Sequence, residues 1–454
     1  MMSPQAAVGA IADRPRHSRL IDIFVMAAGL ALFYGVLSIG RTWFNPLTPE
    51  SPISLSPSAL PLYAAFSLMR LGVAYVISLV FAIAYGYAAA YNDKAERIML
   101  PTLDILQSIP VLSFLPGVML ATAALFPHSR AGLELGSIIL IFTGQTWNIA
   151  FSFYSSVKSI PADLKEAARI NRFSFWQRFT QLELPYSAIG VVWNSMMSVA
   201  GGWFFLMVCE MFPLGERQIR LPGLGSYLQT AANDGNVPAI FWGLGVMISI
   251  IVLLDAMVWR PVIAWANKFK FEEVEGALTP GSAVLNFLRK STVLSYIGRT
   301  TLEPCGEKIT ELFAERADKG RSRRGPIVST WVERTIAALV LAAVAYGVFK
   351  AVMLLLGATR ADMGDIGRGA VATFARVAAA LAIGSAWTIP VGVMIGFSPR
   401  LARVAQPLAQ IAASIPATGL FPVVLLVLLS AHLVSPDSGL GVASLLLMLL
   451  GTQW

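Results

Sequence analysis

Long apolar segments recur along this chain in the pattern typical of a membrane protein built from several helices. Each segment is close to or longer than the roughly 20 residues that a helix needs to cross a bilayer. A polar stretch at about 266–330 separates the first six segments from the last four. The pattern therefore predicts an all-α, polytopic membrane protein. Its expected spans are 21–40, 62–90, 98–126, 133–153, 188–212, 238–265, 331–356, 370–397, 403–431 and 438–454.

The composition favours the same class. Of the 454 residues, 56% are hydrophobic and only 13% are charged, whereas a soluble domain averages about 45–50% and about 25%. With a mean hydropathy of +0.67, these values exclude a disordered chain, a nucleic-acid-binding array and a disulfide scaffold. The two cysteines, Cys209 and Cys305, and the three histidines, His17, His128 and His432, lack metal-binding spacing, so we expect no metal site.

Basic residues indicate which side of the membrane each loop occupies. The net charge is +8, and lysines and arginines gather at 14–19, before the first span, and in the loops near 94–97, 158–178 and 268–270. All of these segments fall on one side if the spans alternate, and that side is expected to be cytoplasmic. Residues 1–20 are then a cytoplasmic N-terminus ahead of an uncleaved first span, and the polar stretch 266–330 is a solvated cytoplasmic linker.

The chain contains an internal repeat. An offset of 306 residues aligns unusual residues without a gap: Arg70 with Arg376, Gly86 with Gly392, Pro101 with Pro407, Ser108-Ile109-Pro110 with Ser414-Ile415-Pro416, and Pro116 with Pro422. Matches of prolines and a membrane arginine are hard to produce by chance, so we infer a duplicated unit. Six spans separate equivalent positions, which makes the repeat parallel, with a pathway expected between the two copies.

The two copies differ in length. Residues 21–265 form the first unit, with six spans and a cytoplasmic loop at 154–187, whereas residues 331–454 form an incomplete second unit. The second unit has four spans and ends inside the fourth. We therefore expect a longer protein of roughly 580 residues, by extension from the first copy.

The loop between the fourth and fifth spans has the most informative pattern. Pro161 suits the first turn of a helix, and the helix that follows has a narrow apolar face at Ile160, Leu164, Ala167 and Ala168. A second helix is expected to start at Ser174, with Gln177 completing a capping box. Its apolar face is Phe175, Phe179 and Leu182, and Pro185 is expected to end it. Two short amphipathic helices suit docking into a groove of another protein.

This loop resembles the cytoplasmic signature of binding-protein-dependent ABC transporter permeases. That signature is Glu-Ala-Ala, three residues, Gly, nine residues, a branched aliphatic residue, one residue and Leu-Pro. The chain has Glu166-Ala167-Ala168, Leu182 and Leu184-Pro185 at this spacing. It departs from the signature at Arg172, which stands at the Gly position. Because Gly permits a sharp turn there, we expect the pair Asn171-Arg172 to make the turn instead, and Asn171 tolerates a left-handed conformation better than most residues.

The resemblance implies a fold, a location and a set of partners. The fold is two parallel-repeat permease units of the type I ABC importer kind, fused in one chain, most similar to nitrate, sulfonate, taurine and bicarbonate permeases. The implied partners are ABC ATPase subunits, a periplasmic or lipid-anchored substrate-binding protein and membrane lipid, with no nucleic acid. ATP and Mg²⁺ would be bound by the ATPase, and this chain would bind no cofactor. The implied location is the bacterial cytoplasmic (inner) membrane, crossed several times, with the N-terminus in the cytoplasm.

The resemblance also implies which loop residues couple transport to ATP hydrolysis. In the family, this loop is a coupling helix that inserts into the ATPase subunit. The coupling residues carried over to this sequence are Glu166, Ala167, Ala168, Arg169, Arg172, Leu184 and Pro185.

Polar side chains within the spans either line a translocation path or hold helices together. Candidate path residues are Arg70, Gln107, Ser108, Gln145, Asn148, Asn194, Ser198 and Arg376. For the two arginines a structural role, such as snorkelling or capping a neighbouring helix, is favoured over attraction of an anion. Glu210 is expected to be a paired or interfacial carboxylate, and Gly201-Gly202 to permit close helix packing.

No enzyme site is expected in this chain. It lacks a G-x-x-x-x-G-K-[ST] phosphate loop, so ATP would be hydrolysed by a partner. Two other functions stay open. An ion-coupled secondary transporter can also contain repeats, although it usually needs ionisable residues at mid-membrane, and a membrane enzyme or scaffold would not need the loop to bind an ATPase.

Overall fold

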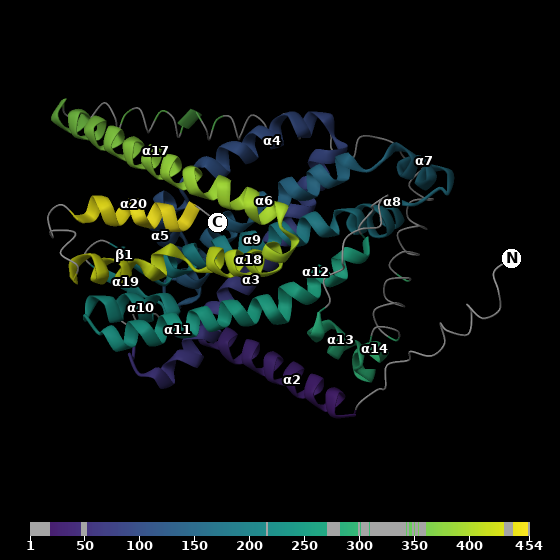
Figure 1. Ribbon diagram of the computed structural model, residues 1–454, viewed down its shortest axis with the longest axis horizontal. Coiled ribbons are helices and arrows are strands. Elements are labelled where there is room, and N and C mark those ends of the chain that lie inside the picture. Colours follow the sequence, from purple (N-terminus) through teal and green to yellow (C-terminus); the bar gives the residue numbers. More distant parts are fainter. Residues whose placement is uncertain are drawn as a thin grey trace.

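The computed structural model describes residues 19–46, 52–214, 217–269, 282–297, 360–430 and 439–452, with a few single positions between 300 and 353. Long helices run side by side along the long axis of the molecule (Figure 1). The first part of the chain forms α2 (Arg19–Thr42), α3 (Leu60–Tyr91), α4 (Asp93–Ser108), α5 (Leu115–Leu125), α6 (Ala131–Ser159), α7 (Ala162–Ile170), α8 (Phe175–Arg178) and α9 (Leu184–Glu210).

A short antiparallel hairpin follows α9. Its strands are β1 (Met211–Leu214) and β2 (Arg217–Arg220), with Met211 opposite Arg220. The remaining helices are α10 (Leu224–Asn233), α11 (Val237–Leu254), α12 (Arg260–Ala266), α13 (Ala283–Arg289), α14 (Thr292–Ile297), α17 (Arg360–Phe397), α18 (Pro399–Ser414), α19 (Ala417–Ser430) and α20 (Gly439–Thr452). Helices α7 and α8 lie at one end of the bundle and the hairpin at the other (Figure 1); we call these the loop end and the hairpin end.

The structure confirms an all-α, polytopic membrane protein. Among the described residues, five helical segments are long and apolar enough to cross a bilayer: Ile21–Thr42, Pro57–Tyr91, Phe175–Glu210, Val237–Phe269 and Met363–Phe397. Helix α6, with 29 residues, is also long enough to span but is more polar. The last predicted span corresponds to the 14 residues of α20, and the span expected at 331–356 lies almost entirely outside the described residues.

Two predicted spans are not single helices. The segment expected at 98–126 divides into α4, a 3₁₀ turn at Val111–Phe114 and α5. The break follows from Pro110, because a residue before proline is pushed out of the helical region, and Ile109 is extended with φ −79° and ψ 126°. The segment expected at 403–431 breaks in the same way between α18 and α19, where Ile415 precedes Pro416.

Helix boundaries recur at the offset found in the sequence. Helix α3 ends at Tyr91 and α4 spans Asp93–Ser108, whereas α17 ends at Phe397 and α18 spans Pro399–Ser414. The residue between each helix pair caps the next helix through its side chain: Asn92 accepts from the backbone of Lys94 and Ala95, and Ser398 from that of Leu401. At equivalent positions of the two segments, a polar side chain thus accepts hydrogen bonds from backbone N–H groups in the first turn of the next helix.

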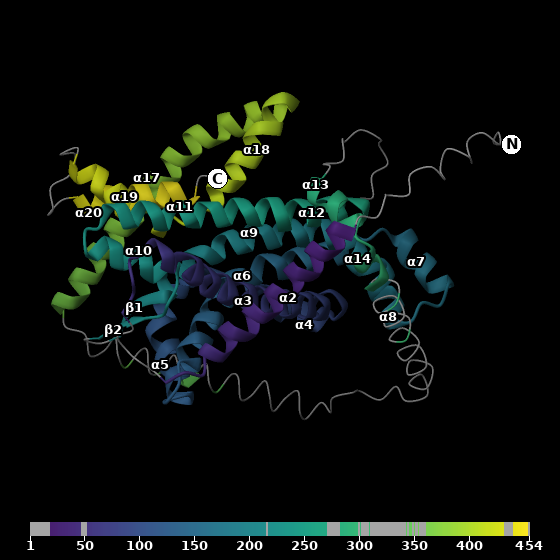
Figure 2. The ribbon, with the colours of Figure 1, turned by 90° about the horizontal axis from the view of Figure 1, so that it is seen from below.

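The core lies where α3, α6 and α9 pack together and α10 and α11 cover them (Figure 2). Trp203 and Leu206 on α9 are fully buried there with Ile141 of α6 and Tyr227 of α10. The expected role of the glycine pair holds for one member: a Cβ on Gly202 would lie 2.4 Å from Nε2 of Gln145, whereas a Cβ on Gly201 would meet nothing within 4 Å. Close approach at Gly202 lets α9 pack directly on α6.

Part of the polar linker folds against the bundle, in contrast to the solvated connector that we expected. Helices α13 and α14 lie at the N-terminal end of α2 (Figure 2). The Asp22 carboxylate of α2 accepts hydrogen bonds from the Ser291 hydroxyl at 2.7 Å and the Thr292 backbone N–H at 2.7 Å. The rings of Phe24 and Phe287 meet edge to face at 6.0 Å. These hydrogen bonds and the aromatic contact stabilise this docked position.

Candidate functional site

Helix α7 ends in a turn that is built around Arg172. The Arg172 N–H donates to the Arg169 carbonyl and the Phe173 N–H to the Ala168 carbonyl, each at 3.0 Å, which is the Schellman pattern. Arg172 has φ +52° and is the one non-glycine residue with positive φ among the described residues. The expected pair Asn171-Arg172 does make the turn, but Asn171 has φ −75°, so the left-handed residue is Arg172. The position where the signature has Gly adopts the conformation that Gly favours.

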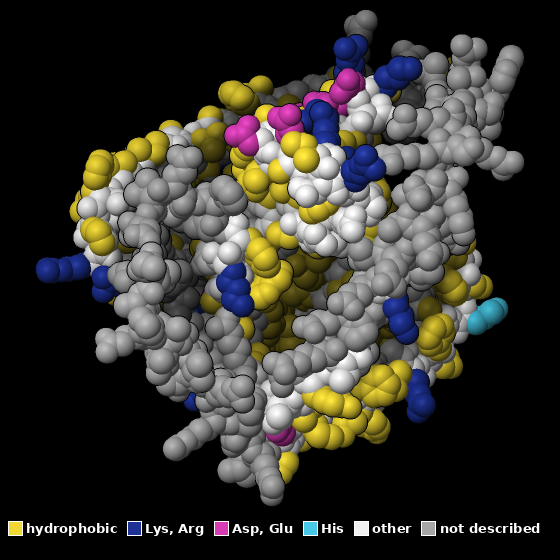
Figure 3. Space-filling model, turned by 90° about the vertical axis from the view of Figure 1, so that its right-hand side faces the viewer, with side chains coloured by type: hydrophobic (Ala, Val, Ile, Leu, Met, Phe, Trp, Pro, Cys, Tyr) yellow, Lys and Arg dark blue, Asp and Glu magenta, His cyan; other side chains and the backbone are white. Residues whose placement is uncertain are grey.

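The residues of α7, including those predicted to couple to an ATPase, separate into a buried and an exposed set. Ala168 is buried and Leu164 half-buried, whereas Glu166, Ala167 and Arg169 are exposed. Ala167 therefore lies outside the buried face, although the apolar pattern had placed it on that face. Ile170 is 74% exposed, and Phe173 and Phe175 of the same loop are exposed to 36% and 51%. Figure 3, which views the loop end, shows acidic and basic side chains gathered at one edge of this face beside hydrophobic ones.

The second half of the loop is continuous with a membrane helix. The predicted capping box is confirmed: the Ser174 hydroxyl accepts from the Gln177 backbone, and the Gln177 side chain accepts from the Ser174 backbone. Pro185, however, does not end this helix. A π-helical turn at Phe179–Glu183 joins α8 to α9, and Pro185 lies in the first turn of α9. The wider turn shifts the hydrogen-bond register where Pro185 lacks an N–H, so the helix can continue.

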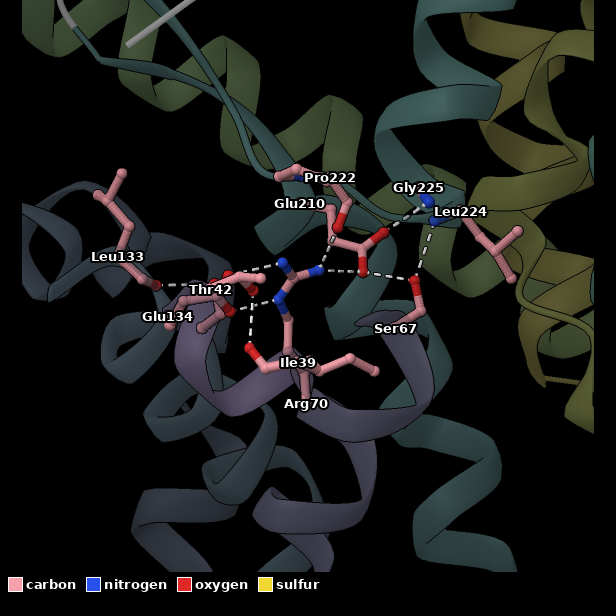
Figure 4. A network of polar contacts seen from close by, with 11 residues as sticks. Ile39, Thr42, Ser67, Arg70, Leu133, Glu134, Glu210, Pro222, Leu224 and Gly225 are labelled. Atoms are coloured by element: carbon pink, nitrogen blue, oxygen red, sulfur yellow. Dashed lines mark hydrogen bonds and ion pairs between the residues drawn. The ribbon is translucent and has the colours of Figure 1, made fainter. Parts of the chain in front are cut away.

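A buried ion network closes the hairpin end of the same helices (Figure 4). Arg70 of α3 binds Glu134 of α6 through Nε at 2.5 Å and Nη2 at 2.7 Å, and Glu210 of α9 through Nη1 at 2.8 Å. Nη1 also donates to the Pro222 carbonyl at 2.9 Å. None of the three charged side chains is more than 3% exposed. The paired carboxylate expected for Glu210 is therefore found, and its partner is Arg70.

The segment 221–225 completes this network. Glu210 also accepts from the Ser67 hydroxyl at 2.6 Å and from the Gly225 N–H at 2.6 Å. A Cβ on Gly223 would lie 2.2 Å from Cδ of Glu210, so only glycine fits there. Charges taken out of water must be paired and fully hydrogen-bonded, and these contacts meet that condition. Arg70 thus joins α3, α6, α9 and the start of α10, rather than facing an open path.

The other candidate path residues do not converge on one site. Gln145 and Ser198 are buried, and no hydrogen-bond partner is found for either side chain among the described residues. Asn194 is half-buried and donates to the Gly190 carbonyl at 3.0 Å. The remaining candidates, which are all exposed, are Gln107, Ser108, Asn148 and Arg376.

A cavity of about 470 Å³ lies at the hairpin end, between α9–α10 and α19–α20. Its polar lining consists of Gln229, Asn233 and Thr418, and Met207, Met211 and Phe421 supply apolar walls. None of the candidate path residues lines it. Gln229 and Asn233 are on α10, which the hydrophobic pattern did not predict as a helix. The four-residue spacing of these two amides was the one available signal, because it puts them on one helix face.

Known proteins resemble the part of the chain that contains the loop. Residues 74–258 match the family described as binding-protein-dependent transport system inner membrane component. A putative aliphatic sulfonates transport permease protein of Bacillus subtilis is 21% identical over 266 residues, 57% of this chain and 91% of the relative. A nitrate import permease protein of Leptolyngbya laminosa is 24% identical, covering 43% of this chain and 64% of the relative.

A taurine transport system permease protein of Escherichia coli is 23% identical over 210 residues, 46% of this chain and 71% of the relative. The helical architecture defines the class as an all-α, multi-pass membrane protein, and the matched segment is similar to permease proteins of transport systems. These three relatives are permease proteins of transport systems for sulfonates, nitrate and taurine.

Proposed function

We propose that this chain is the membrane-spanning permease subunit of an ATP-driven ABC importer and that α7 and α8 dock into a separate ATPase. The observation that carries the proposal is the form of α7. Glu166 and Ala167 project from an exposed helix that ends in a fixed Schellman turn, with Ile170 uncovered beside them. Phe173 and Phe175 of the same loop are exposed as well, and a group of exposed apolar side chains on ordered short helices favours insertion into a groove of a partner.

The partners follow from this role. The ATPase would hold ATP and Mg²⁺, and the loop end would face the cytoplasm of a bacterial cell, with the N-terminus on the same side. A separate substrate-binding protein would deliver the substrate at the hairpin end. The energy would then reach this chain as a rigid-body movement imposed by the ATPase, which biases one of two arrangements of the permease units.

The substrate class that we propose is a small anion such as a sulfonate, taurine, nitrate or bicarbonate. The cavity between α9–α10 and α19–α20 supports this class, because Gln229, Asn233 and Thr418 offer neutral hydrogen-bond donors. Neutral donors suit transient binding, since a fixed charge would hold an anion too firmly for release. Arg70 is already occupied by Glu134 and Glu210.

We also propose that two permease units are fused in this chain. Three observations support this: the sequence repeat, the equal boundaries of α3–α4 and α17–α18, and the packing of α18 and α19 on α9 and α11. The path would then run between the units, where the cavity lies.

The experiment uses the complete transporter in proteoliposomes. Glu166→Lys or Ala167→Asp should abolish co-purification of the ATPase and ATP-dependent uptake. Asp93→Lys, a charge reversal at the start of α4 near the loop end, serves as the control and should leave both unchanged. Full ATPase binding by both loop variants would contradict the docking role. Uptake driven by a proton gradient without ATP would instead indicate a secondary transporter.

A further inference from the structure

The coupling loop is fastened to the membrane helices by four side chains that the signature does not include. They are Arg178 of α8, Glu183 of the π-helical turn, and Tyr87 and Tyr91 near the end of α3; we call them the loop clamp. Nε of Arg178 lies 2.7 Å from Oε1 of Glu183, which is fully buried. The Tyr91 hydroxyl donates to the same Glu183 carboxylate, and Nη2 of Arg178 donates to the Tyr87 hydroxyl at 2.8 Å.

Ring contacts close the clamp. The guanidinium of Arg178 lies 4.5 Å from the centre of the Tyr91 ring, within the range of a cation–π contact. The Tyr87 ring meets Phe175 of α8 edge to face at 5.3 Å. Each of these contacts joins the loop to α3, so a movement of α8 must take the end of α3 with it.

The same two helices are joined again at the hairpin end. Arg70 of α3 binds Glu210 of α9 at 2.8 Å. At 1.5 Å per residue, Arg70 lies about 32 Å from Tyr91 along α3, and Glu210 about 40 Å from Glu183 along α9. Helix α3 and the continuous segment α8–α9 are thus joined at both ends of a length that covers the hydrocarbon core of a bilayer. Tyrosine hydroxyl and ring contacts join them at the loop end, and an ion pair joins them at the hairpin end.

The hairpin end of α9 and the residue that follows it form part of the cavity wall. Met207 and Met211, on either side of Glu210, line it, and so does Gly225, whose N–H is bound by Glu210. A shift applied at the clamp would therefore reach the cavity wall as movement of a rigid pair. Energetic coupling between distant sites can be carried by contiguous packed side chains, hydrogen bonds and ion pairs of this kind.

We propose that the loop clamp transmits movement of the coupling loop to α3 and α9, and through Arg70–Glu210 to the wall of the cavity. Arg178, Glu183, Tyr87 and Tyr91 are positioning residues in this mechanism and do not contact the substrate or the ATPase. The proposal rests on the proposed function, because it takes α7 and α8 to be the ATPase docking loop. It adds that docking and transmission are separable properties of different side chains.

The test measures docking and coupling separately in the complete transporter reconstituted with its ATPase and binding protein. The variants are Tyr91→Phe, which removes one hydroxyl, and Glu183→Gln, which removes the charge. We expect ATPase co-purification within twofold of wild type, and at least a tenfold fall in substrate molecules transported per ATP hydrolysed. Arg178→Lys keeps the charge but loses the planar contact with Tyr91. We expect this variant to retain less than half of the wild-type ratio of substrate transported to ATP hydrolysed.

Tyr85→Phe is the matched control, because Tyr85 is on the same helix and its hydroxyl donates to the Met99 carbonyl outside the clamp. This variant should keep the wild-type ratio. A wild-type ratio in both Tyr91→Phe and Glu183→Gln would overturn the proposal. Loss of ATPase binding together with uptake would also overturn it, since the clamp would then only shape the docking loop. Failure of the docking function itself is seen independently in the Glu166→Lys variant.

Discussion

Nη1 of Arg70 and Oε1 of Glu210 lie 2.8 Å apart, 140 residues apart in the chain, with neither side chain exposed. Arg70 also binds Glu134, so a single guanidinium serves two carboxylates from two other helices. Removing one partner of such a buried group leaves a charge that is neither solvated nor paired. The resulting loss of folding free energy exceeds the net contribution of the ion pair itself.

The first prediction is that Arg70→Met destabilises the folded protein by roughly 3–5 kcal/mol, because two carboxylates lose their counter-charge. Thermal unfolding in detergent, followed by size-exclusion chromatography, measures the effect. Arg376→Met is the matched control, since Arg376 is the repeat equivalent and is exposed. Equal unfolding temperatures for the two variants would contradict a structural role for the network.

The second prediction concerns Arg172, whose φ of +52° is unfavourable for a residue with a side chain. A left-handed residue costs about 1–2 kcal/mol, so Arg172→Gly should stabilise the turn after α7, offset in part by the entropy of glycine. Arg172→Val should destabilise it by more than 1 kcal/mol, because a β-branched residue tolerates positive φ poorly.

Hydrogen exchange of the amides at 168–173 checks this prediction. Exchange should slow or stay equal in Arg172→Gly and quicken in Arg172→Val. Arg169→Val, one turn earlier in helical conformation, provides the comparison for loss of an exposed arginine. If Arg169→Val and Arg172→Val quicken exchange equally, the left-handed position has no special cost.

The third prediction is that Gly223→Ala disrupts the ion network. The added Cβ would lie 2.2 Å from Cδ of Glu210, and that carboxylate is pinned by Arg70, Ser67 and Gly225. Overpacking of this kind costs about 1–3 kcal/mol, and we expect a lower unfolding temperature. Gly201→Ala, with open space around the new methyl group, should not lower it.

The fourth prediction concerns pH at the loop end. Lys158 and then Tyr154 bind the Glu96 carboxylate, each at 2.6 Å, and lower its pKa below the usual value. A lowered pKa in the folded state stabilises the fold above the unfolded pKa, and this stabilisation is lost as the pH falls through the folded pKa. Exchange of α4 amides, corrected for intrinsic rates, should therefore rise from pH 6 to pH 3 in wild type.

Glu96→Gln should remove most of this pH dependence, because the titrating group is gone. Asp104→Asn on the same helix is the control and should retain it. A Glu96→Gln profile that matches wild type would assign the pH dependence to other carboxylates.

The fifth prediction separates the cavity from the path residues that the sequence suggested. Asn233→Leu and Thr418→Val should raise the KM for uptake at least tenfold, because both side chains line the cavity. Ser108→Ala and Asn148→Leu, at exposed positions outside it, should change KM by less than twofold. A large rise in KM for the exposed variants, with little change for the cavity variants, would indicate that the translocation path does not pass through the cavity.

Local features of the site were accessible from the sequence because they depend on neighbours in the chain. The Ser174–Gln177 capping box forms as predicted, since both partners lie within one helical turn. Helix breaks at Ile109-Pro110 and Ile415-Pro416 arise where the prolines stand. The continuation of the helix through Pro185 was missed, because it depends on a π-helical turn that buries Glu183 against α3.

The sequence by itself determined the class of protein, most of the helical spans among the described residues and the place of the α7–α8 loop. These follow from apolar segments of bilayer length and from residue spacing, both of which are local properties. Only the tertiary structure decided that Arg70 is bound by Glu134 and Glu210, that Arg178 and Glu183 hold the loop to α3, and that the cavity lies beside α10. These outcomes depend on which helix faces pack together. In a protein that buries charge inside a membrane, each charge must find its partner wherever the fold brings one within reach.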